Sequence, residues 1–265
     1  MKKSNNTLGD GQSVEYVESV SDLENRIRAH KLFSRTSLEN VLMRCIEQVN
    51  ENSALLDLGC GAGNFFKLFY SKARTYVGVD ISENLLEDFR RQHNETIVLI
   101  KSSMDELPIF QNSSFDAIFS IYSIYYSLRP VELVRSLHNL LSDVGHLFVI
   151  GPSKIEHAVE ITQFCNILST VGLKTEKNER IENFHDKIIP QITKTFQSVD
   201  IEEIDGSLYF PNPQEWARYV VSTPQVKETS SLDSDNLLSL AIDYSVSNNC
   251  LSVSKYMTAL IAGKQ

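Results

Sequence analysis

An apolar stretch that runs into three closely spaced glycines constrains the fold of this chain more than any other feature. Residues 55–69 read LLDLGCGAGNFFKLF, with glycines at positions 59, 61 and 63. The residues before the glycines predict a buried strand, and the pattern after them indicates a helix. Because glycine lacks a Cβ, such a turn can be tight and its amides can approach a ligand closely. Doubly wound α/β folds bind their ligands at strand-to-helix turns of this kind, beyond the carboxyl ends of the parallel strands.

Strands and helices alternate around this turn. Strands are predicted over 53–59, 75–81, 96–102, 114–122 and 145–151, and helices over 64–72, 83–92 and 129–142. Strands that are joined by single helices form a parallel sheet with right-handed crossovers. The apolar spacing of 22–48 predicts two earlier helices that separate near 34–36.

The pattern changes after Gly151. Helices are predicted over 154–170, 213–222 and 234–246, and strands over 199–210, bent at Gly206, and 251–263. The structure of 171–198 is not defined by its polar sequence. We therefore predict one α/β domain with a doubly wound, mostly parallel seven-stranded sheet and an inserted helical cap.

Charge and cysteine content narrow the function classes. The 265 residues carry a net charge of −9, and binding to a phosphate backbone depends on Lys and Arg, so a nucleic-acid substrate is not expected. The four scattered cysteines form no CxxC pair and have no histidine at ligand spacing, so neither a disulfide nor a metal site is predicted. The MKK start is followed by polar residues, and no run is long enough to span a membrane. We expect a cytoplasmic protein.

The glycine spacing separates two kinds of cofactor site. The dinucleotide pattern G-x-G-x-x-G would require glycine at position 64, which is Asn64. A NAD-dependent dehydrogenase is therefore a distant alternative. The stretch DLGCGAG instead resembles the first motif of the class I S-adenosylmethionine (SAM)-dependent methyltransferases, and the resemblance extends over about residues 50–151. It implies a Rossmann-like fold, SAM as cofactor and S-adenosylhomocysteine as product. It also implies that the turn lies beneath the methionyl part of SAM. The residues that would bind SAM there are Asp57, Gly59, Cys60, Gly61 and Gly63.

A second acid supports this resemblance. VGVDIS places Asp80 at the end of the next predicted strand, about twenty residues beyond the first glycine, where an acid accepts hydrogen bonds from ribose hydroxyls. Ile81 follows it in the predicted site. The alternative is an acid that merely begins a helix, where the helix dipole favours it.

The adenine site departs from the family pattern. SSMDELPIFQNSSFDAIFS resembles the family's third and fourth motifs, but Ser103 stands where an acid is usual, four residues before the Leu of LP. The serine hydroxyl can accept from the adenine amino group, and Met104 can supply backbone polarity and a soft face for the ring. Asp105 is the alternative acceptor. Ser120, in the following strand, completes the predicted cofactor site.

The residues on the acceptor side are less defined. Methyl transfer needs an acceptor held in line behind the methyl group, and in some cases removal of a proton. The stretch FSIYSIYYS leaves the fourth predicted strand, so Tyr125 and Tyr126 are candidates to face the acceptor. His157 and His185 are candidate general bases near neutral pH. Aromatic packing and solvated histidines are the alternatives.

These observations predict a SAM-dependent methyltransferase that acts on an O or N atom of a small molecule. A tRNA- or protein-modifying methyltransferase and a non-catalytic SAM-binding partner subunit remain as alternatives. We expect N-terminal helices over 1–50, the SAM-binding core over 51–151, a cap insertion over 152–198, and the last strands with inserted helices over 199–265. The sequence does not define the acceptor or the oligomeric state.

Overall fold

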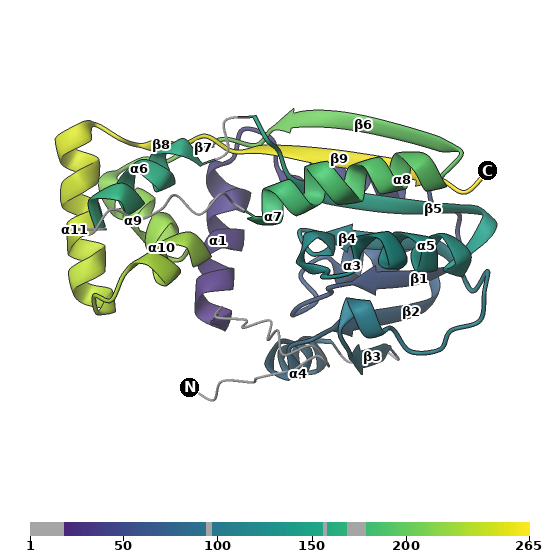
Figure 1. Cartoon of the computed structure of the whole chain (residues 1–265). Coiled ribbons are helices and arrows are strands. Elements are labelled where there is room, and N and C mark those ends of the chain that lie inside the picture. The colour runs from purple at the N-terminus through teal and green to yellow at the C-terminus, as the bar shows by residue number, and fades with distance from the viewer. Residues whose placement is uncertain (1–18, 94–96, 156–157, 169–178) are drawn as a thin grey trace.

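The computed structural model describes residues 19–93, 97–155, 158–168 and 179–265. A seven-stranded sheet with the strand order β3-β2-β1-β4-β5-β9-β6 forms its centre (Figure 1). Its strands are β1 (Ser53–Leu58), β2 (Ala73–Asp80), β3 (Val98–Lys101), β4 (Phe115–Ile121), β5 (Leu141–Pro152), β6 (Ser198–Asp205) and β9 (Tyr256–Gly263). Strands β1 to β5 pair in parallel, and β9 runs antiparallel between β5 and β6. The predicted fold class is confirmed.

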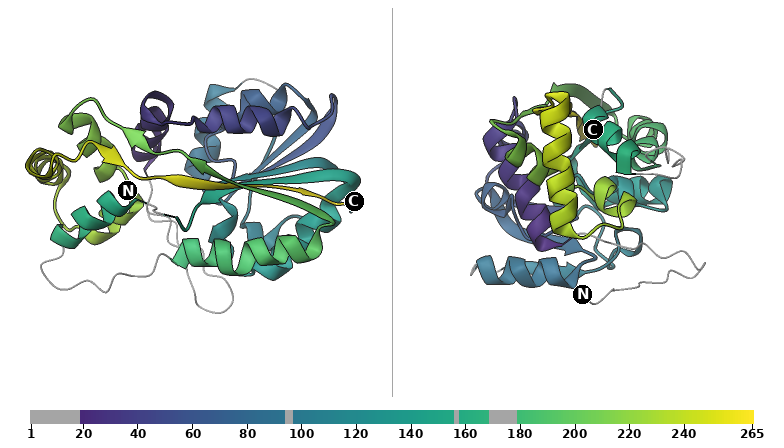
Figure 2. Two further views of the ribbon diagram at one scale, coloured as in Figure 1. Left: turned by 90° about the horizontal axis from the view of Figure 1, so that it is seen from above. Right: turned by 90° about the vertical axis from the view of Figure 1, so that its left-hand side faces the viewer.

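Helices cover both faces of the sheet (Figure 2). One face carries α2 (Leu38–Ile46), α3 (Phe66–Tyr70) and α4 (Glu83–Gln92). The other face carries α5 (Pro130–Leu140) and a helical run of α7 (Glu179–Glu182), the π-helical η3 (Asn183–Ile188) and α8 (Ile189–Thr195). Successive strand residues point to opposite faces. Both faces are therefore apolar, as in other doubly covered parallel sheets.

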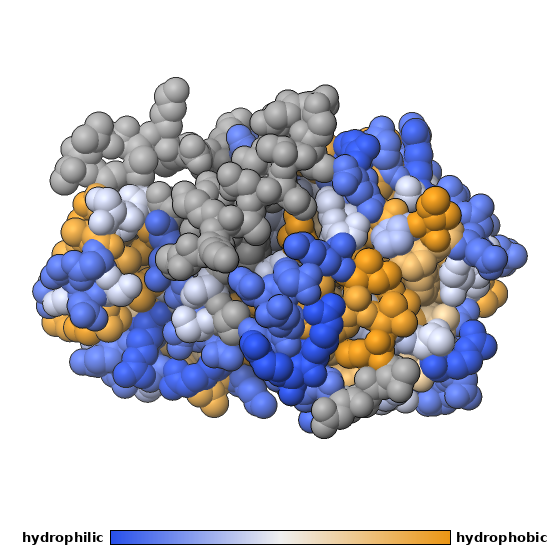
Figure 3. Space-filling model, turned by 90° about the horizontal axis from the view of Figure 1, so that it is seen from below, coloured by the Kyte–Doolittle hydropathy of each residue, from blue (hydrophilic) through white to orange (hydrophobic). Residues whose placement is uncertain are grey.

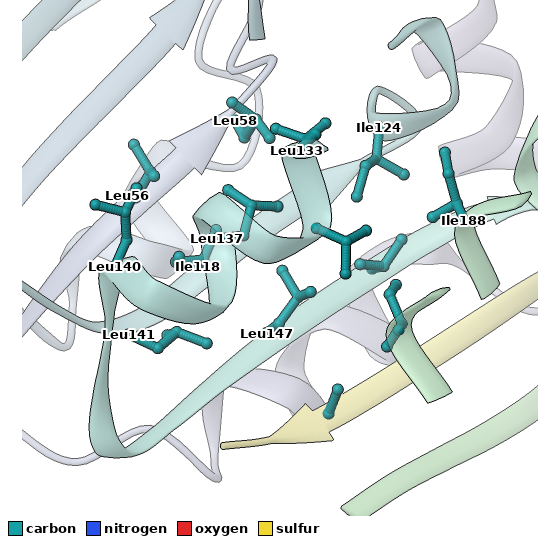
Figure 4. Close-up of a cluster of buried hydrophobic side chains, with 14 of the residues drawn as sticks. Leu56, Leu58, Ile118, Ile124, Leu133, Leu137, Leu140, Leu141, Leu147 and Ile188 are labelled. Atoms are coloured by element: carbon teal, nitrogen blue, oxygen red, sulfur yellow. The ribbon is translucent and has the colours of Figure 1, made fainter. Parts of the chain in front are cut away.

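The larger of the two sheet cores lies under α5. Figure 4 shows Leu133, Leu137 and Leu140 of this helix pointing at strand residues that include Leu56 and Leu147. All five side chains are at most 7% exposed. Burial of a leucine side chain contributes about 1.5–3 kcal/mol, so this layer holds the strands whose carboxyl ends form the site.

A helical cap stands beside the carboxyl ends of the strands (Figures 1 and 2). It consists of α1 (Val20–Phe33), α6 (Val159–Leu168), α9 (Pro213–Val221), α10 (Pro224–Thr229) and α11 (Ser234–Asn248), with a two-stranded antiparallel sheet of β7 (Leu208–Tyr209) and β8 (Ser252–Val253). Trp216 is its fully buried centre, and the indole Nε1 donates to the carbonyl of Ser252 at 3.0 Å. This tryptophan therefore packs the cap.

The segments that form the cap differ from those predicted from the sequence. Among the described residues of 152–198, α6 is the helix that contributes to the cap, because η3 and α8 bury Phe184, Ile188 and Ile192 against the sheet. The two N-terminal helices also separate, with α1 in the cap and α2 on the sheet. The predicted strand 251–263 is two strands, β8 and β9, and α10 was not predicted.

One edge of the sheet, formed by β3, exposes apolar side chains. Strand β3 forms this edge, and Val98 and Ile109, on and after it, are 53% and 104% exposed. Figure 3 views this side of the molecule and shows hydrophobic side chains gathered beside a hydrophilic surface. No helix in the described part of the chain has the length and hydrophobicity needed to cross a bilayer.

Candidate functional site

The three glycines of the turn after β1 all have positive φ, at +79° for Gly59, +55° for Gly61 and +76° for Gly63. At two of them, other side chains of the protein occupy the space that a Cβ would need. A Cβ on Gly59 would lie 2.3 Å from the Cβ of Ser123, and one on Gly63 would lie 2.6 Å from the ring of Phe89. These two glycines therefore permit close packing within the protein.

Gly61 differs from its two neighbours. The atom nearest to a Cβ built on it is Leu85 Cδ1, at 3.9 Å. Its amide donates to Asp80 Oδ2 at 2.9 Å, which fixes the orientation of the turn. The part of the chain that the structure describes leaves space beside this glycine, as the close approach of a ligand would require.

Asp80 ends β2 and holds the turn with its carboxylate. Oδ2 accepts from Gly61, and Oδ1 accepts from the amide of Ser82 at 2.8 Å. Burial raises the pKa of this carboxyl, and the backbone hydrogen bonds oppose the shift. Each carboxylate oxygen has a second lone pair, so both remain able to accept from ribose hydroxyls. Ile81, which lies between Asp80 and Ser82 in the chain, is partly exposed.

Asp57 lies beneath the turn and is 5% exposed. Its Oδ2 accepts from the hydroxyl of Tyr76 at 2.6 Å. Burial raises the pKa of Asp57 to about 7, the Tyr76 hydrogen bond lowers it, and the charge of Asp80 raises it further. The contact seen in the structure is thus structural, and the predicted contact with the methionyl group stays a prediction.

Two further predicted residues support the turn from below. The Cys60 thiol packs on Gly78, where a Cβ would lie 2.9 Å from Sγ, so Cys60 presents only its backbone on the turn side. Ser120 is fully buried, with its Oγ 2.6 Å from that of Ser123. Ser123 in turn donates to the carbonyl of Leu58 at 2.5 Å, which joins the ends of β1 and β4. The sequence analysis did not identify Ser123, because its only signal is its neighbour across the sheet.

The predicted adenine residues lie after β3. Ser103 caps η1 (Met104–Glu106) by accepting from the amide of Asp105 at 3.2 Å. The Asp105 carboxylate accepts from the hydroxyl of Ser127 and from the amide of Leu128 at 2.8 Å. It therefore anchors the loop before α5. This engagement favours Ser103 and Met104 over Asp105 for the adenine.

The two candidate tyrosines differ in accessibility. Both lie in η2 (Ile124–Tyr126), with ring centroids 4.9 Å apart. Tyr125 is 9% exposed, lies 6.1 Å from the ring of Phe184, and has a pKa raised by burial. Tyr126 is partly exposed and has the guanidinium of Arg180 over its ring at 5.0 Å. Tyr126 is thus the more accessible phenol.

The two candidate histidines have different outcomes. His157 lies outside the described residues. His185 Nε2 lies 2.9 Å from the carbonyl oxygen of Pro152. A carbonyl only accepts, so this nitrogen carries the proton, and only Nδ1 remains as a possible base.

A cluster missed by the sequence analysis joins the cap to the core. Lys255 Nζ lies 2.9 Å from His30 Nε2, 3.4 Å from the hydroxyl of Tyr219 and 5.3 Å from the ring centroid of Tyr122. Burial, together with the charge of Arg26, lowers the pKa of Lys255 to about 7. These residues come from separate segments, so no local pattern in the sequence brings them together.

A doubly wound sheet with a glycine turn after its first strand and an acid that ends its second is typical of α/β domains that bind a nucleotide cofactor. Comparison with known proteins identifies the kind of domain. Residues 56–149 match the family model of a methyltransferase domain. This match confirms the predicted resemblance to the class I SAM-dependent methyltransferases over that stretch, and SAM is the cofactor of that family.

Individual similarities are more limited. The chain is similar to a malonyl-[acyl-carrier protein] O-methyltransferase of Legionella pneumophila (33% identity, covering 37% of this chain and 36% of that protein). It is also similar to a tRNA U34 carboxymethyltransferase of Pseudoalteromonas atlantica (29% identity, covering 37% and 32%). The chain thus spans about a third of the length of these two curated relatives, and 56% of an uncharacterized protein of Haemophilus influenzae. The structure of a putative methyltransferase from Bacillus halodurans shares the fold (TM-score 0.59, 15% identity, covering 86% and 99%).

Proposed function

We propose that this protein transfers a methyl group from SAM to an O or N atom of a small-molecule acceptor. The observation that carries the proposal is the open side of Gly61, whose amide is fixed by Asp80 at the carboxyl edge of the sheet. A turn that is filled on both flanks and open at its centre fits a ligand that approaches the backbone. The family match over 56–149 supports SAM as that ligand.

Each part of SAM has its own contact residues in this proposal. Gly61 and its neighbours contact the methionyl end, Asp80 accepts from the ribose hydroxyls, and Ser103 with Met104 contacts the adenine. When bound, SAM supplies an electrophilic methyl group on a sulfonium. Tyr126 and the cap side of the sheet edge orient the acceptor and exclude water, which is the main contribution a protein makes to an in-line displacement.

Two features favour a small acceptor. The cap stands against the carboxyl edge of the sheet, where it can enclose a ligand (Figure 1). The net charge of −9 counts against a polynucleotide. The names of the relatives favour two further acceptors for the test, a tRNA and an acyl group on a carrier protein.

The test uses the full chain with SAM labelled in its methyl group. It is incubated separately with fractionated small metabolites of the source cell, with bulk tRNA, and with a protein extract that contains acyl carrier protein. We expect label in a small-molecule fraction, and loss of that label in Asp80→Ala. Label confined to tRNA or protein would overturn the small-molecule assignment. Tight SAM binding without transfer in any of the three incubations would instead support a non-catalytic SAM-binding subunit.

A further inference from the structure

The backbone that carries Lys255 is clamped on two sides. Its amide donates to Ser207 Oγ at 3.2 Å, and its carbonyl accepts from the amide of Gly206 at 2.8 Å. The preceding Ser254 donates to the Glu160 carboxylate from its amide at 2.8 Å and from its hydroxyl at 2.6 Å. The break between β8 and β9 is therefore a rigid support that directs one lysine side chain.

That side chain points into the junction of cap and core. His30 on α1 and Tyr219 on α9 approach its Nζ from the cap, and the Tyr122 ring approaches it from the end of β4. An ammonium has three donors and no acceptor. His30 Nε2 and the Tyr219 hydroxyl thus accept two of its hydrogens, and the third has no acceptor among the contacts made by Lys255.

Two acidic groups that bond the residues around Lys255 do not bond its side chain. The Glu160 carboxylate holds Ser254. The Asp205 carboxylate accepts from Arg35 at 2.8 Å and from the Ser207 amide at 3.0 Å. Within the described part of the chain, no carboxylate accepts from Lys255. A buried cation without an anionic partner is costly, and burial together with the positive charge of Arg26 lowers the pKa of Lys255 to about 7.

The cluster also adjoins the cofactor turn. Tyr122, beside the Lys255 ammonium, is followed directly by Ser123, which donates to Leu58 and fills the space against Gly59. Lys255 and the glycine turn thus lie on either side of the end of β4. An acceptor that reaches the methyl group from the cap side would pass this ammonium.

We propose that Lys255 binds a carboxylate of the methyl acceptor, with His30 and Tyr219 as positioning residues that hold its ammonium. The acceptor class is accordingly a small carboxylic acid whose body lies against the Tyr122 ring. The assignment to the acceptor rests on the proposed methyl transfer, whereas the anion site itself does not.

The test measures the ionisation of Lys255 by NMR of the full chain labelled at the lysine Cε carbons, saturated with S-adenosylhomocysteine. Benzoate is the probe, and benzamide is its uncharged counterpart. Benzoate should raise the pKa of Lys255 by about two units, and benzamide should leave it unchanged. Because benzoate stays ionised, its affinity should fall about 20-fold between about pH 6.5 and about pH 8.5 as Lys255 loses its proton.

Three variants complete the test. Lys255→Met should weaken benzoate binding at least tenfold and abolish its pH dependence, whereas Lys255→Arg should retain binding without that pH dependence. Lys264→Met is the matched control, because Lys264 is also largely buried but donates to the carbonyl of Leu141 at the other end of the sheet. An unchanged Lys255 pKa with benzoate, malonate and phosphate would overturn the proposal. These readouts require no methyl transfer, so the anion site and the proposed function can fail separately.

Discussion

Alanine at Gly61 and at Gly59 should have opposite consequences for cofactor binding and stability. Among the described residues, a Cβ on Gly61 would meet no atom closer than 3.9 Å, so Gly61→Ala should destabilise the fold by only the left-handed backbone strain, about 1–2 kcal/mol. A Cβ on Gly59 would lie 2.3 Å from that of Ser123, a steric overlap that adds to the strain. We expect Gly59→Ala to lose several times more stability, on the order of 3–5 kcal/mol.

Cofactor binding should be affected by the substitution at Gly61, which causes the smaller loss of stability. The methyl of Gly61→Ala occupies the space that the ligand is expected to approach, so binding of S-adenosylhomocysteine should weaken at least tenfold, or about 1.4 kcal/mol. Urea denaturation measures the stability of each variant, and titration calorimetry measures affinity for the folded protein. An unchanged dissociation constant for Gly61→Ala would refute the assignment of this glycine to the cofactor site. A stability loss as large as that of Gly59→Ala would refute the structural reasoning.

Three further results are expected. Asp80→Ala should weaken binding of S-adenosylhomocysteine by about 1.5–3 kcal/mol in calorimetry, since it removes hydrogen bonds to a charged group; unchanged affinity in a folded variant would exclude the ribose role. Phe at both Tyr125 and Tyr126 should lower turnover at least tenfold, or about 1.4 kcal/mol of barrier, with SAM affinity unchanged; a loss of thermal stability alone would make them packing residues. Because the folded state holds a proton on Asp57 up to about pH 7, its contribution to stability should fall by about 1 kcal/mol per unit as pH rises from about 5 to about 7. Asp57→Asn should flatten that slope in urea denaturation, and identical slopes would mean that Asp57 is already ionised.

Local patterns in the sequence determined the central elements of this protein. The helix predicted over 83–92 has these bounds in the structure, and Ser82 caps it by accepting from the amide of Leu85 at 3.4 Å. The glycine turn and Asp80 were identifiable because each follows directly on an apolar strand. Strand and helix periodicity, caps and turns depend on residues a few positions apart, so they can be read along the chain.

Tertiary structure alone decided which helix covers which surface. Both α1 and α2 carry apolar residues at helical spacing, yet one packs in the cap and the other on the sheet. The stretch 179–195 carries no turn or cap that distinguishes a sheet helix from a cap helix. Its place follows from the apolar surface that β4, β5 and α5 leave for Phe184 and Ile188.

The cluster around Lys255 shows the same limit most clearly. His30 and Lys255 are 225 positions apart in the chain, and Tyr219 and Tyr122 come from two further segments. Lysine and histidine are ordinary surface residues in any local pattern. They are candidates for a functional role only because the fold buries them, places Lys255 Nζ 2.9 Å from His30 Nε2, and bonds the carboxylates of Glu160 and Asp205 to other groups. Desolvation and charge pairing depend on which groups the fold brings together, and the chain order does not contain that information in local form.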